Sequence, residues 1–216
     1  MPHAARLSDP TAHGVPLSAG PGSANVRIGN LPAWRALRGG ALAAAAEAAS
    51  QAAQTLMKNR SLTPITATPL LAQAQEGMQR AGAAASVETN PAAAAATASA
   101  LATLNAAHAA LTSAWSAASA VPGGMAPATS AFTQALHAAV SVAVGAVMTA
   151  IAGPVDLHTC PVPCPAPPHG PGVVTSGSTS VRVNGLAAAR VGDKVMEACG
   201  GANPISAGCT SVTIGG

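Results

Sequence analysis

Three segments of this 216-residue chain share one pattern, and they are divided between its two ends. Each has an Asp, then a His or Cys two to six residues later, then a Gly-led run with two β-branched residues. The runs are 22–30, 177–185 and 208–216. A unit this short cannot bury a core alone, so the three copies must close on one another. The repeat therefore predicts a small pseudo-threefold β domain built from both chain ends, residues 1–36 plus 154–216.

The middle of the chain, residues 37–153, has a different character because alanine dominates it. Alanine is the best helix former, so we expect a mostly helical insertion of about four helices. They are predicted at 41–58, 69–85, about 90–120 and about 129–151, with the last two as a hairpin and with Pro64 and Pro69 as breaks. The predicted fold class is α+β: a conical β domain interrupted by a helical insertion.

Composition narrows the possible functions. Only 8% of residues are charged, the net charge of +3 shows no basic cluster, and there are two Trp, one Phe and no Tyr. This is not the pattern of a nucleic-acid binder. Because large apolar side chains are few, the hydrophobic core of the β domain is expected to be small. Small domains of this kind are commonly stabilised by a structural metal ion. Since the N-terminus shows no signal peptide, the four cysteines are expected to bind metal or stay as thiols.

Two interpretations remain open for the second half of the insertion. No Asp, Glu, Lys or Arg occurs between Glu88 and Asp156, and 138–153 is almost wholly apolar. This run is slightly shorter than the roughly 20 residues of a membrane span. The favoured interpretation is a helix bundle whose weakly charged surface suits a partner. The other is insertion into a membrane.

Several motifs carry a resemblance to a known family. They are Ala-Ala-Arg6-Leu-Ser-Asp9-Pro-Thr-Ala-His13, Asn-Leu-Pro-Ala-Trp-Arg35, Asp156-Leu-His-Thr-Cys160-Pro, Pro-His169-Gly-Pro-Gly and Asn-Gly-Leu-Ala-Ala-Ala-Arg190-Val-Gly-Asp193. Together they resemble the PAAR-repeat family, whose members form the sharp tip of the type VI secretion spike. The resemblance covers under half of the chain. It implies a cone of short strands that docks on the trimeric VgrG spike, with a zinc ion near its apex.

The resemblance also implies a ligand set of three His and one Cys, carried over to His13, His158, His169 and Cys199. Such a set suits a closed, tetrahedral structural Zn²⁺ site. Either Cys160 or Cys164 can replace His158, since both lie in the same unit. Cys209 is interpreted as a small buried residue, and His3, His108 and His137 as incidental. The Asp and Arg residues of the units are interpreted as turn caps and pairing partners, not as catalytic groups.

The expected function is mechanical, with no enzymatic turnover. We expect a spike tip that caps the VgrG trimer, one copy per trimer, and sharpens it for membrane puncture. The helical insertion then docks an effector or a chaperone, or braces the spike. The alternative is a tip-delivered effector that acts on membranes through the hairpin at 88–155. The expected location is the cytoplasm during assembly, followed by secretion without a signal peptide.

Overall fold

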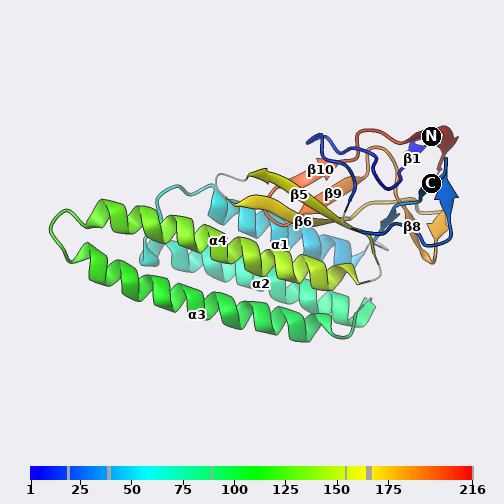
Figure 1. The fold of residues 1–216 in the computed structure, drawn as a ribbon. Coiled ribbons are helices and arrows are strands. Elements are labelled where there is room, and N and C mark those ends of the chain that lie inside the picture. Colours follow the sequence, from blue (N-terminus) through cyan, green and yellow to red (C-terminus); the bar gives the residue numbers. More distant parts are fainter. Residues whose placement is uncertain (19, 38–39, 89, 154, 164–166, 216) are drawn as a thin grey trace.

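The computed structural model describes residues 1–18, 20–37, 40–88, 90–153, 155–163 and 167–215. Among these residues, helices occupy the middle of the chain and short strands lie toward both ends (Figure 1). The expected α+β class with a helical insertion is confirmed. The helices are α1 (Ala41–Met57), α2 (Pro64–Glu88), α3 (Ala93–Ser119) and α4 (Met125–Ala152).

Two helices begin earlier in the chain than the predicted starts at residue 69 and at about residue 129. Helix α2 starts at Pro64 and contains Pro69, although Pro69 was expected to mark the start of a new helix. Proline removes the hydrogen bond to the carbonyl four residues earlier. That carbonyl belongs to Ile65, which is 84% exposed, so water can satisfy it. Helix α4 begins at Met125 and holds Pro127 in its first turn, where the missing N–H costs nothing.

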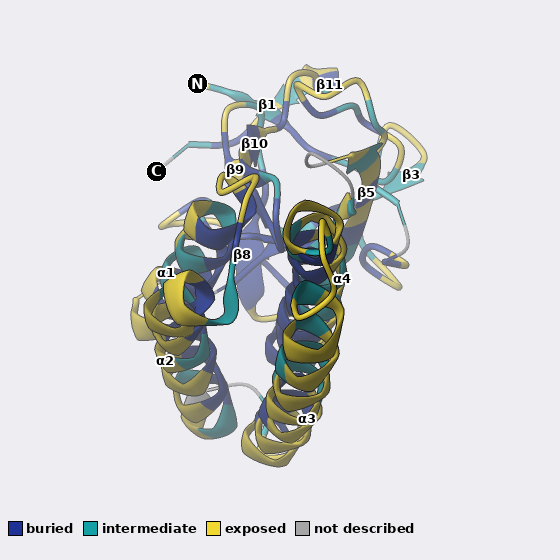
Figure 2. Cartoon of the chain, turned by 90° about the vertical axis from the view of Figure 1, so that its left-hand side faces the viewer, coloured by how far each residue is buried: buried dark blue, intermediate teal, exposed yellow. Residues whose placement is uncertain are grey.

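Helices α1 and α4 separate the strands from α2 and α3. Helix α1 packs on two strands of the main sheet and α4 on a third, whereas α2 and α3 pack on other helices. Figure 2 shows exposed residues along the outer faces of α2 and α3. Helix α4 buries a stripe at helical spacing, namely Leu136, Val140, Val144, Val147 and Ile151. Its apolar residues therefore form the core of the bundle.

The main sheet is antiparallel and has the strand order β10-β9-β6-β5. Its strands are β5 (Leu157–Pro163), β6 (Pro168–Val174), β9 (Lys194–Glu197) and β10 (Gly201–Pro204). The remaining strands form three small sheets. These are β1 (His3–Ala4) with β11 (Cys209–Thr213), β2 (Arg27–Ile28) with β3 (Leu31–Pro32), and β4 (Arg35–Ala36) with β8 (Leu186–Ala188) and β7 (Arg182–Val183).

A closed ring of backbone hydrogen bonds marks the pseudo-threefold axis. The amide of Ala5 donates to the carbonyl of Ala189 at 2.9 Å, that of Ala189 to Trp34 at 3.0 Å, and that of Trp34 to Ala5 at 3.0 Å. Each of the three residues directly precedes an arginine, namely Arg6, Arg35 or Arg190. All three are buried, with Trp34 the largest side chain among them. The three copies of the repeat thus meet in equivalent environments.

Three Arg–Asp pairs repeat the same symmetry. In each pair the Arg amide donates to Asp Oδ2, at 2.7, 2.8 and 2.7 Å, and the guanidinium donates to both carboxylate oxygens. The pairs are Arg6–Asp9, Arg35–Asp156 and Arg190–Asp193. The first and third are local turns. The second spans the whole helical insertion, so Arg35 and Asp156 belong to one motif that the insertion divides.

Candidate metal centre

The N-terminal segment brings His13 to the main sheet through a tight loop. Thr11 donates its amide to the carbonyl of Val15 at 2.9 Å, and the Ala12 amide donates to Pro204 on β10 at 2.8 Å. The backbone amide of His13 itself donates to Asn203 Oδ1 at 3.1 Å. The loop is therefore held against β10 by its own backbone and by one buried Asn side chain.

Strands β5, β6 and β9 supply the other side chains. His158 and Cys160 lie two residues apart on β5, and both are fully buried. Alternate residues of a strand share a face, so these two point the same way. His169 lies on β6, where its neighbour Gly170 pairs with Cys160. Glu197 ends β9 and pairs with Gly172 of β6.

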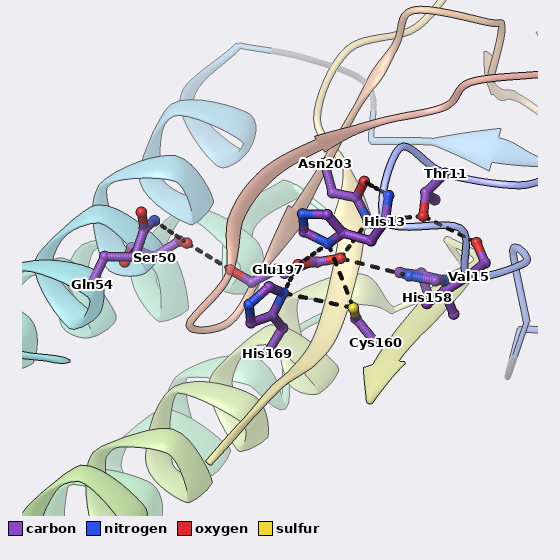
Figure 3. Close-up of polar contacts among 10 residues, drawn as sticks. All are labelled: Thr11, His13, Val15, Ser50, Gln54, His158, Cys160, His169, Glu197 and Asn203. Carbon is purple, nitrogen blue, oxygen red and sulfur yellow. Dashed lines mark hydrogen bonds and ion pairs between the residues drawn. The ribbon is translucent and has the colours of Figure 1, made fainter. Parts of the chain in front are cut away.

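Four of these side chains form a compact group: His13, Cys160, His169 and Glu197 (Figure 3). Their ligand atoms all lie within 4.8 Å of one another. Cys160 Sγ is 3.7 Å from His13 Nδ1 and 3.6 Å from His169 Nδ1. Glu197 Oε2 is 3.4 Å from His13 Nδ1 and 2.7 Å from His169 Nδ1. The group draws on three separate parts of the chain.

These separations agree with a tetrahedral metal site. Metal–sulfur and metal–nitrogen bonds of about 2.3 and 2.0 Å place neighbouring ligand atoms of a tetrahedron about 3.5 Å apart. Three of the four distances are close to this value. The Glu197–His169 distance is shorter and corresponds to a hydrogen bond or an ion pair. The group can thus hold a metal ion after only a small movement of one carboxylate oxygen.

The burial of Glu197 gives independent support for a cation at this position. Its side chain is fully buried, and Oε1 accepts a hydrogen bond from Asn203 Nδ2 at 2.6 Å. No Lys or Arg among the described residues forms an ion pair with Glu197. The groups that can pair with its carboxylate are His13, His158 and His169, and each carries a positive charge only when it is protonated. A buried carboxylate costs several kcal/mol unless a positive charge compensates it. A metal ion supplies that compensation.

His158 lies directly beside the group. Its Nε2 is 3.7 Å from Glu197 Oε1, and neither ring nitrogen has a hydrogen-bond partner of good geometry among the described residues. Burial lowers the pKa of His158, while the Glu197 carboxylate acts in the opposite direction. The ring is therefore neutral and offers a lone pair, which is the form in which His binds metal.

Cys160 and Gly200 complete the environment. Burial raises the pKa of the Cys160 thiol to about 11, and nearby Glu197 adds to the effect. A metal must therefore displace a proton from this sulfur in order to bind it. At Gly200, a Cβ atom would overlap Glu197 Oε2 and the His169 ring. Only glycine leaves this space open.

The structure brings together some of the residues expected from the sequence and not others. His13 and His169 lie in the group, and His158 adjoins it. Cys199 lies outside the group: it is buried in the apolar core that the helices share with the sheet, and its amide donates to the carbonyl of His169 at 3.0 Å. Cys160 supplies the sulfur of the group. Cys164 lies outside the described residues.

The fold and the site together define a small β domain that is organised around a metal-binding group and interrupted by helices. Residues 165–216, the last quarter of the chain, match the family model described as the PAAR motif, so this part of the β domain is similar to PAAR-repeat proteins. Comparison with curated proteins and with solved structures gave no significant match. The motif indicates a protein associated with the type VI secretion spike, and PAAR proteins are structural components of that spike.

Proposed function

We propose that this protein caps the trimeric VgrG spike, one copy per trimer, and forms its sharp tip. The observation that supports this most directly is the ring of backbone hydrogen bonds through Ala5, Trp34 and Ala189. A single chain with an internal threefold can present three similar edges to a threefold partner. A monomer without internal symmetry cannot make equivalent contacts with all three subunits of a trimer.

The experiment is to mix the purified protein with a VgrG trimer and measure the mass of the complex by light scattering after size-exclusion chromatography. The expected result is one copy of this chain on three VgrG subunits. Absence of a complex, or three copies per trimer, contradicts capping on the axis. A useful variant is Trp34→Ala, which removes the largest buried side chain on the axis and is expected to weaken capping.

We propose that the metal is a single structural Zn²⁺. Bound zinc supplies a positive charge that neutralises Glu197 and joins the N-terminal loop to the sheet. His13, Cys160, His169 and Glu197 are the nearest protein ligands, with His158 available to replace the carboxylate. Four protein ligands leave no open position for a reactive water, which fits a structural role. Elemental analysis of the purified protein is expected to give about one zinc per chain, and no bound metal contradicts the assignment.

We propose that the helical insertion carries an effector or binds a chaperone. An apolar groove of about 540 Å³ runs between α3 and α4 and includes Val142, which is 70% exposed. This groove offers a surface on which such a partner can bind.

We also propose that the protein is secreted by the type VI apparatus after assembly in the cytoplasm, without a signal peptide. Its test is the amount of this protein in the medium of cells with an active and an inactivated type VI apparatus. Equal amounts in both contradict the proposal.

A second candidate function rests on α4. This helix, Met125–Ala152, is long and apolar enough to cross a membrane by length and composition, although 56% of its most apolar window is buried in the bundle. Membrane action therefore requires the α3–α4 hairpin to leave the bundle. Release of a dye from liposomes by the full chain supports this function, and liposomes that stay intact contradict it.

A further inference from the structure

The helical insertion contacts the backbone of a residue in the metal-binding group. Ser50 lies on α1 and is fully buried. Its Oγ donates a hydrogen bond of 2.6 Å to the carbonyl of Glu197. Figure 3 shows Ser50 reaching the backbone carbonyl of Glu197 from the helix, while His13 and His169 lie beside its carboxylate, one on each side. One residue of β9 thus connects the helix to the metal-binding group.

Gln54 fixes the direction of the Ser50 hydroxyl. One turn further along α1, Gln54 Nε2 donates to Ser50 Oγ at 3.1 Å and to the Ser50 carbonyl at 3.3 Å. Because the hydroxyl oxygen accepts from Gln54, its hydrogen is free to point at Glu197. The hydrogen bonds therefore form a directed chain, Gln54 to Ser50 to Glu197, that runs from the insertion into the β domain.

The sheet is built to let α1 approach this closely. Gly201 pairs with Glu197 across the β9–β10 hairpin and has a positive φ of 82°. A Cβ atom at Gly201 would lie 2.8 Å from Gln54 Oε1, so a larger residue would displace the Gln54 amide group as well as strain the backbone. The position of Gln54 against the hairpin is thus best kept by a glycine at this site.

We propose that Ser50 is a positioning residue for Glu197, and that it couples metal binding to the docking of helix α1. The inference rests on the proposed metal site. By fixing the Glu197 carbonyl, Ser50 restricts the end of β9 from which the carboxylate reaches the metal. Coupling of this kind is reciprocal: a docked α1 strengthens metal binding, and bound metal holds α1 more firmly. Residues that orient metal ligands affect affinity by about 10- to 100-fold when removed.

The first test compares two hydroxyl deletions on the same helix. Ser50→Ala removes the bond to Glu197. Thr55→Ala is the matched control, because Thr55 is exposed and its hydroxyl donates to the Gln51 carbonyl of its own helix. The dissociation constant for Zn²⁺ is measured by competition with a chromophoric chelator. We expect about 10-fold weaker binding for Ser50→Ala and no change for Thr55→Ala.

If Ser50 only stabilises the fold and does not position Glu197, the Zn²⁺ dissociation constant does not change. In that case Ser50→Ala lowers the stability of the metal-free protein and the metal-bound protein equally, and the dissociation constant matches that of Thr55→Ala. That outcome overturns the proposal while leaving the metal site intact. If the unmodified protein binds no Zn²⁺, the proposed metal site fails, and the coupling fails with it.

The second test needs no variant and so does not depend on whether Ser50→Ala folds. Amide hydrogen exchange of the full chain is followed with Zn²⁺ and after its removal by chelator. We expect metal to slow exchange in the second half of α1, around Ser50 and Gln54, as well as in β9. Helix α3 packs on α2 and α4 and serves as the internal reference. Slowed exchange confined to the strands overturns the proposal.

Discussion

Cys160 and Cys199 are both buried cysteines, but among the described residues only Cys160 belongs to the metal-binding group. Cys160 Sγ lies within 3.7 Å of two His nitrogens, whereas Cys199 packs in the apolar core. We predict that Cys160→Ser abolishes the thiolate-to-cobalt absorption of the Co²⁺-substituted protein. Cys199→Ser, the matched control, keeps it. Loss of the absorption in Cys199→Ser alone contradicts the assignment and supports the ligand set implied by the family resemblance.

The sequence predicted part of this site for a clear reason. His13 follows the Asp of the first repeat segment, His169 lies in one of the motifs that carry the family resemblance, and imidazoles are common metal ligands. Glu197 gave no such signal, because it lies in Lys-Val-Met-Glu and resembles an exposed charge at a strand end. Its burial depends on the partner strands β6 and β10, and no local pattern encodes them. The choice between Cys160 and Cys199 likewise depends on tertiary structure, because Cys160 lies on β5 and Cys199 in the turn between β9 and β10.

The pair that closes the helical insertion is buried more deeply than its two equivalents. Asp156 is fully buried and accepts three hydrogen bonds from Arg35, of 2.7–3.0 Å. Removing one partner of a buried pair leaves an uncompensated charge. We predict that Asp156→Ala lowers the free energy of unfolding by about 3 kcal/mol, measured by urea denaturation. Glu76→Ala breaks the exposed Glu76–Arg80 pair of α2 and is expected to cost at most about 1 kcal/mol. Similar losses in both variants contradict the prediction.

Helix α4 contains a buried histidine that makes the bundle sensitive to acid. Burial lowers the pKa of His137, against an opposing effect of the Leu56 and Asn59 carbonyls. The His137 imidazole therefore binds a proton at a lower pH in the folded state than in the unfolded state, where it is protonated below a pH of about 6.5. Stability is fully present above that pH and falls as the pH decreases.

We predict that His137→Leu removes part of this acid sensitivity. Urea denaturation at pH 7.5 and pH 5.5 measures it in both proteins. The loss of unfolding free energy between the two pH values is expected to be smaller in the variant, by at most about 1.4 kcal/mol per pH unit below 6.5. An equal loss in the two proteins shows that His137 does not titrate during unfolding.

At the level of helices and strands, the repeat predicted the β domain and the alanine-rich middle predicted the helices. The sequence did not show that the helical insertion divides one copy of the Arg–Asp motif. In the sequence, Arg35 follows the first Gly-led run and Asp156 precedes the second, so they were assigned to different copies of the repeat. The structure joins them in one Arg–Asp motif, equivalent to Arg6–Asp9. The spacing of three residues in the local pairs hid this equivalence, since 120 residues separate Arg35 and Asp156. Only the closure of the symmetric domain makes the match visible.

The metal-binding group joins parts of the molecule that are far apart in the chain. His13, Cys160 and Glu197 come from the N-terminal loop, from β5 after the insertion, and from β9. Metal bound only by the folded state stabilises it by mass action. We predict that free Zn²⁺ at 100 times its dissociation constant adds about 2.7 kcal/mol to the free energy of unfolding, relative to chelator-treated protein. Thermal denaturation measures the shift, and an unchanged Tm contradicts a structural metal.

The Arg35–Asp156 pair also has a mechanical consequence. The chain leaves and re-enters the β domain beside the two partners of a single ion pair, and α1 is hydrogen-bonded to the sheet a short way beyond. The helices are attached through two crossings of the chain and pack on the main sheet through α1 and α4, so they cannot rotate as they would on a single flexible tether. On the proposed spike tip, the helices would therefore keep a fixed orientation, and a force on them would reach the β domain between Arg35 and Asp156.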